Sequence, residues 1–158
     1  MKRKPAYSDD PAWLLERMKK YCAFQERCIY DVKRKLKEWN IREEVVDRLI
    51  ARLIKEDYIN EERFARIFAG GKFRNNKWGK NRIIRELETR NIPDIYIQVG
   101  LHEIGDEEYI TTLRRLIYKK NKELDIANVD VRNRKLASFA IGKGYEPGLV
   151  WDILNYRD

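Results

Sequence analysis

A basic stretch near the middle of the chain holds the residues best suited to binding chemistry. Segment 73–82 reads FRNNKWGKNR, with four Lys or Arg residues, three Asn and no acid. Cations attract phosphate and carboxylate groups, and amides bond equally well to phosphate oxygens or to polar protein surfaces. Trp78 has two interpretations: it stacks on a nucleic-acid base, or it is the hydrophobic staple that fixes the next helix. We favour the staple.

A second group of cations lies about fifty residues earlier, opposite the apolar stripe of a helix predicted over 27–39. If both groups face the same side, they form one cationic stripe that suits an acidic partner, although many charged helix faces are only solvated. Arg63 either belongs to this stripe or forms a structural ion pair. The predicted partner or DNA contacts are Lys33, Arg34, Lys37, Arg63, Lys72, Arg74, Lys77, Lys80, Arg82 and Arg85.

No catalytic constellation can be assembled from the sequence. The acid pairs at 61–62 and 107–108 stand in the first turns of predicted helices, where the helix dipole favours acids. Segment 70–72 lacks the spacing of a phosphate-binding loop, and His102 is isolated on an apolar helix. Cys22 and Cys28 support neither a disulfide framework nor a zinc site. We therefore expect a binding protein, not an enzyme, with no cofactor and no metal.

Apolar residues recur with the helical period along nearly the whole chain, so we predict an all-α fold. One stripe falls at Ile29, Val32, Leu36 and Trp39, and no strand alternation competes with it. Few Pro or Gly residues interrupt the helix formers, with four Pro and eight Gly in 158 residues.

An internal repeat of about fifty residues emerges from the helix ends. Asn40, Asn91 and Gly144 each precede an apolar residue, which is typical of a helix terminus in the left-handed conformation. These sites lie 51 and 53 residues apart, and sliding the chain by those offsets aligns apolar positions on both sides of the cap. The aligned sets are Val32, Ile83 and Leu136; Leu36, Leu87 and Ala140; and Val46, Ile97 and Val150.

Each repeat has room for three helices. We predict a tail over 1–10 and repeats over 11–58, 59–104 and 105–158, stacked as an elongated, curved array because such small units cannot bury their apolar faces alone. The predicted helices cover 11–24, 27–39 and 42–55, then segments starting at 61, near 79 and at 93, then 106–124, 131–143 and 147–156.

The bulk composition points to an acidic partner. The net charge is +8 and the pI is about 9.4, which favours nucleic acid or an anionic protein surface. By residue counts, the excess of cations lies in the first two thirds of the chain. The sequence has no leader-like start and no apolar run long enough to span a bilayer, so we expect a reduced, cytoplasmic protein.

The chain resembles the RecX family of bacterial regulators of the RecA recombinase. The resemblance rests on Glu-Glu-Arg-Phe-Ala at 61–65, Lys-Trp-Gly at 77–79 and Arg-Ile-Ile-Arg-Glu-Leu at 82–87, with weaker matches from Pro11 onward. It implies a monomer that lodges in the groove of the RecA filament on single-stranded DNA and restrains filament growth, ATP hydrolysis and strand exchange. Phe64, Ala65, Trp78 and Gly79 would be its structural motif, and Leu36 and Leu87 would help to hold the units.

Two rival functions remain open at this point. A direct DNA binder, such as a helix-turn-helix transcription regulator, would need one recognition helix dense in base-reading side chains and usually a two-fold partner. The spread of charge over two repeats argues against it. A structural adaptor for an acidic protein is the third interpretation.

Overall fold

The computed structural model describes residues 10–156 of the 158-residue chain. Within that range the backbone forms nine α-helices and no β-strand, so the predicted all-α class is confirmed. Apart from Asp10, the predicted tail lies outside the described residues, as do the last two residues of the third predicted repeat.

The helices fall into three consecutive groups of three, and they pack mainly within their own group. We call these groups the first, second and third units. The residue boundaries that we drew between repeats stay a prediction. The first unit holds α1 (Pro11–Phe24), α2 (Ile29–Glu38) and α3 (Glu43–Lys55); the second holds α4 (Glu61–Asn76), α5 (Lys80–Thr89) and α6 (Asp94–Leu101); the third holds α7 (Asp106–Glu123), α8 (Val129–Gly142) and α9 (Pro147–Asn155).

Helix starts follow the local sequence signals. The Asp10 side chain accepts a hydrogen bond from the Ala12 N–H at 3.0 Å, and Pro11 occupies the first helical position. Asn60 accepts from the Arg63 N–H at 2.9 Å at the start of α4. These two predicted helix starts are therefore confirmed.

The repeated helix ends are also confirmed. Asn40, Asn91 and Gly144 have φ values of 55°, 57° and 106°, in the left-handed region. The residue after each cap donates its N–H back to the preceding helix, as Ile41 does to the Leu36 carbonyl at 3.2 Å. All three aligned sets of apolar residues are buried.

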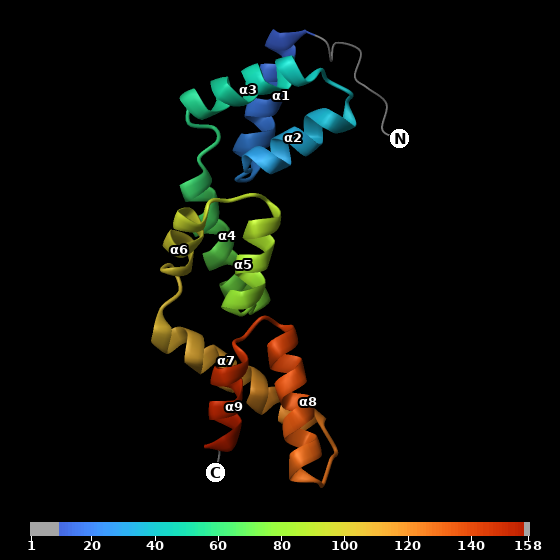
Figure 1. Cartoon of the computed structure of the whole chain (residues 1–158), viewed down its shortest axis with the longest axis vertical. Coiled ribbons are helices and arrows are strands. Elements are labelled where there is room, and N and C mark those ends of the chain that lie inside the picture. Colours follow the sequence, from blue (N-terminus) through green and yellow to red (C-terminus); the bar gives the residue numbers. More distant parts are fainter. Residues whose placement is uncertain (1–9, 157–158) are drawn as a thin grey trace.

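The three units lie one after another along the long axis of the molecule (Figure 1). The shape is elongated, as the repeat predicted. Buried side chains form two apolar clusters. One cluster lies within the first unit and extends to Ile59, and the other runs without interruption through the second and third units.

The glycine pair at 70–71 of α4 is not where helices approach closely in the second unit. A Cβ at Gly71 would meet nothing within 4 Å, and the nearest atoms to one at Gly70 belong to the Arg74 side chain on the next turn of α4. At Gly100 of α6, an added Cβ would lie 2.6 Å from the Ala65 carbonyl oxygen of α4. Gly100 therefore permits the crossing of α4 and α6.

Candidate partner-binding surface

The basic stretch forms the end of one helix, a short turn and the start of the next. α4 ends at Asn76, and its C-cap residue Lys77 has a left-handed φ of 58° and donates its N–H to the Phe73 carbonyl at 2.9 Å. Trp78 and Gly79 make the turn, and α5 begins at Lys80. The cations therefore project from two helices that meet at one corner of the second unit.

Trp78 packs against its own unit. Its ring meets Phe68 edge-on at 6.2 Å between centroids, and it lies against the cluster that contains Ile83. The Arg82 guanidinium lies 4.2 Å from the Trp78 ring centroid, and Lys72 Nζ lies 4.9 Å away. These contacts favour the staple interpretation over stacking on a base, and they give Lys72 and Arg82 a packing role.

Gly79 touches the third unit directly. An added Cβ would lie 2.2 Å from both the Gly144 carbonyl carbon and the Tyr145 nitrogen. Its N–H donates to the Lys143 carbonyl at 2.8 Å, and the Asn81 N–H donates to the Gly144 carbonyl at 2.9 Å. No larger residue fits at position 79 without separating two backbone segments.

Two further cations of the stretch have partners within the chain. Lys80 Nζ lies 4.7 Å from the centroid of the Tyr109 ring and 3.8 Å from an Asp106 carboxylate oxygen. Lys77 Nζ donates to the Arg74 carbonyl at 2.7 Å, although its side chain remains exposed. Only some of the predicted contact residues are therefore free to meet a partner.

Arg63 forms ion pairs within the chain, which is one of the two roles that the sequence left open. Its Nε lies 2.5 Å from Glu26 Oε1, and its Nη1 lies 3.0 Å from Asp57 Oδ2. Nη2 also donates to the Asp57 carbonyl at 2.9 Å. Arg63 thus links the α1–α2 loop, the α3–α4 connection and α4. The neighbouring motif residues Phe64 and Ala65 are buried.

The predicted contact cations that are exposed lie on the first and second units. In the second unit, Arg74, Lys77 and Arg85 are exposed, whereas Lys72, Lys80 and Arg82 are half-buried. In the first unit, Lys33, Arg34 and Lys37 are all exposed on α2.

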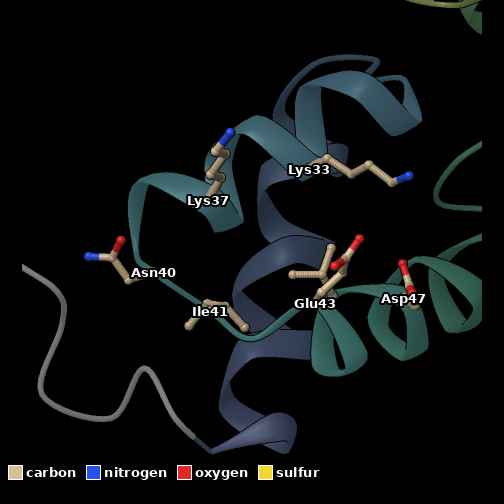
Figure 2. Close-up of a pocket in the computed structure, with 7 residues that line it drawn as sticks. Lys33, Lys37, Asn40, Ile41, Glu43 and Asp47 are labelled. Carbon is tan, nitrogen blue, oxygen red and sulfur yellow. The ribbon is translucent and has the colours of Figure 1, made fainter.

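Lys33 and Lys37 border a shallow hollow of about 520 Å³ (Figure 2). Its other rim carries Glu43 and Asp47 from the start of α3. The two acids reduce the positive potential on this side of the first unit. The alignment of the α2 cations with those of α4 and α5 into one stripe stays a prediction.

Sequence reasoning missed the partners of the Trp-Gly pair in the third unit. The Tyr145 hydroxyl donates to the Lys77 carbonyl at 3.0 Å, and the Lys80 N–H donates to the Tyr109 hydroxyl at 3.0 Å. Tyr109 also donates to Glu146. Burial, reinforced at Tyr109 by the hydrogen bond to Glu146, raises the pKa of both tyrosines, so the hydroxyls stay protonated as donors. The Gly144 cap was the only available signal.

Residues 10–156 contain no group of three or more His, Cys, Asp or Glu side chains that could hold a metal ion. Among the helices of the described range, none has the length and apolarity needed to cross a bilayer.

Comparison with known proteins gives consistent matches. Residues 60–101 match the family described as RecX, second three-helix domain. The chain is 32% identical over 117 residues to the regulatory protein RecX of Lactobacillus johnsonii, covering 74% of this chain and 42% of that protein. It is 30% identical over 128 residues to the regulatory protein RecX of Clostridium acetobutylicum, covering 78% of this chain and 59% of that one.

The fold agrees with these sequence matches. A solved crystal structure of a regulatory protein RecX superposes with a TM-score of 0.84 over 96% of this chain and 76% of the other, at 22% identity. The chain spans about half the length of the curated relatives that it matches. By sequence match and by shared architecture, this chain belongs to the RecX family.

Proposed function

We propose that the chain is a non-enzymatic regulator of the RecA recombinase that acts as a monomer by occupying the groove of the RecA filament on single-stranded DNA. Occupancy would restrain filament growth, ATP hydrolysis and strand exchange. Similarity to proteins named regulatory protein RecX, over about three quarters of this chain, carries the proposal.

The physical properties of the chain support this function. An elongated array of units can follow a helical groove over a longer distance than a compact domain of the same size. A net charge of +8 suits a groove lined by acidic side chains and DNA phosphates. The exposed cations Arg74, Lys77 and Arg85 are the second unit's contribution to that contact.

The test is RecA ATPase activity on single-stranded DNA with the protein added. A variant with Arg74→Glu, Lys77→Glu and Arg85→Glu should inhibit at least tenfold less potently than the wild type, because three exposed attractive charges become repulsive. Lys72, Lys80 and Arg82 are left intact, since they pack on Trp78 and Tyr109 and their loss would disturb the fold.

The control variant carries Arg42→Glu, Arg48→Glu and Lys55→Glu. It makes the same change in net charge at exposed positions in and beside α3, and it should inhibit nearly as well as the wild type. Equal inhibition by all three proteins would remove the basic surface of the second unit from the mechanism. Failure of the wild type to inhibit would overturn the proposed function.

A further inference from the structure

The third unit carries a cationic helix face that the residue counts conceal. In the second half of α7, the buried residues Leu113 and Ile117 face the core. The opposite side shows an exposed tyrosine at 118, surrounded at helical spacing by cations. The exposed residues of this face are Arg114, Arg115, Tyr118, Lys119 and Lys122.

The charge on this face is not neutralised locally. Among residues 10–156, none of its four cations forms an ion pair, although Lys122 Nζ lies 4.4 Å from the Tyr118 ring centroid; Lys120, on a different side of α7, pairs with Glu123 at 3.6 Å. Segment 109–135 holds eight Lys or Arg and three Asp or Glu. The third unit has little net charge only because the acids gather in the first turn of α7 and elsewhere. Arg115 and Lys119 form a like-charge i, i+4 pair that opposes the helix.

A hollow of about 620 Å³ lies beside this face, lined by residues of α7 and α9 and by Tyr156 directly after α9. Ile110, Leu149 and Ile153 provide apolar lining, and Arg114 and Asp152 are its charged residues. Two tyrosines also line it, and both are largely exposed: Tyr118 at 59% and Tyr156 at 86%.

We propose that this hollow and the adjoining α7 face form a contact for single-stranded nucleic acid. Unpaired bases would stack on Tyr118 and Tyr156 over the apolar lining, because every base offers a π-face to an aromatic ring. Arg115, Lys119 and Lys122 would hold the phosphates along α7. The inference rests on the proposed function, and it assigns the third unit a direct contact with the DNA strand of the filament.

The chemistry favours a single strand over the alternatives. Bases in a duplex are stacked within it and do not enter a hollow on a protein surface. A single strand offers both groups that this surface can take, phosphates for the cations and the π-faces of unpaired bases for the tyrosines. Asp152 repels phosphate, so the phosphates run along the α7 side of the hollow and not along α9.

The test measures the affinity of the full chain for a fluorescein-labelled dT20 oligonucleotide in the absence of RecA. Fluorescence anisotropy reports the binding, and the titration is repeated at several salt concentrations. Tyr118→Ala should weaken binding about tenfold and leave the salt slope unchanged, since stacking releases few ions. Tyr118→Phe should bind like the wild type. Arg115→Glu, Lys119→Glu and Lys122→Glu together should weaken binding at least tenfold and reduce the log–log salt slope by about 2, because three phosphate contacts are lost.

The α3 triple variant with Arg42→Glu, Arg48→Glu and Lys55→Glu serves again as the charge-matched control, and a 20-base-pair duplex is the second ligand. The inference is overturned if Tyr118→Ala binds dT20 like the wild type, if it weakens duplex binding equally, or if the control weakens binding as much as the α7 variant. Inhibition of RecA by the wild type would then still support the proposed function. Conversely, tyrosine-dependent dT20 binding without any effect on RecA would support this contact alone.

Discussion

The two joints between the three units differ in the chemistry that holds them. The first joint, between the first and second units, rests on ion pairs: Arg63 with Glu26, and Arg90 with Asp31 at 4.0 Å. Among residues 10–156, no backbone hydrogen bond links α1–α3 with α4–α6. Cys28 is the single fully buried first-unit residue in the apolar cluster of the other two units.

The second joint, between the second and third units, is an apolar core crossed by backbone and hydroxyl hydrogen bonds. Gly79 and Asn81 donate to the loop after α8, and Tyr109 packs against Phe73 and Tyr145 at 5.8 and 5.0 Å between ring centroids. One apolar cluster spans both units. Coupling between neighbouring units is therefore unequal in this array. The second and third units share one core, whereas the first unit is held to the second mainly by ion pairs.

Gly79→Ala is expected to have the largest effect on stability, and it acts on the second joint. A Cβ 2.2 Å from two backbone atoms must separate the loops, so we expect the free energy of unfolding to fall by about 3 kcal/mol. Hydrogen exchange should show lost protection in both the second and third units, and much less change in the first. Gly142→Ala is the control, because a Cβ there meets nothing within 4 Å; it should change stability by less than about 1 kcal/mol.

Arg63→Ala should loosen the first joint with a smaller loss, about 2 kcal/mol, because it leaves Glu26 half-buried without its cation. Thiol labelling separates this effect from general unfolding. Burial raises the pKa of Cys28 to about 12 and that of Cys22 to about 11, so at pH 8 both remain protonated and unreactive in the closed protein.

Cys28 lies in the cluster shared across the first joint, and Cys22 lies in the core of the first unit. Arg63→Ala should therefore speed the labelling of Cys28 more than that of Cys22, and higher salt should increase the labelling of Cys28 in the wild type. Arg66→Ala removes only an exposed pair with Glu62 and should change neither rate. Equal acceleration at both cysteines would mean that the first unit unfolds and that the joint does not open by itself.

Tyr145→Phe is the mildest change and tests the second joint alone. It removes the hydroxyl donor to the Lys77 carbonyl, so stability should fall by about 1 kcal/mol in chemical denaturation. The labelling rate of Cys28 should stay at the wild-type value. Faster labelling, comparable with that of Arg63→Ala, would show that the two joints are coupled and would remove the contrast between them.

Most of the fold could be predicted from local signals. Caps such as Asp10 and Asn60, and the left-handed ends at Asn40, Asn91 and Gly144, depend on residues close in sequence, so they can be recognised without tertiary information. The aligned apolar sets added the repeat. Together these gave the helix order and the three-unit layout.

The candidate surface was harder to predict because a cation's partners are distant in sequence. Glu26 lies 37 residues before Arg63, and Tyr145 lies 68 residues after Lys77. Nothing in the sequence distinguishes the half-buried Arg82 from the exposed Arg85 on the same helix. Counting charge per repeat also concealed the α7 cations, since counts do not record which side of a helix a residue occupies.

The closed core of the first unit has an evolutionary consequence. Its own apolar cluster lies between Leu14 and Ile59, so a lineage can exchange this unit for another, or an engineer can graft it, by rebuilding the ion pairs at Arg63 and Arg90 and the buried contact of Cys28. The second and third units share one apolar core and cannot be separated in this way. They must be inherited, transplanted or redesigned together.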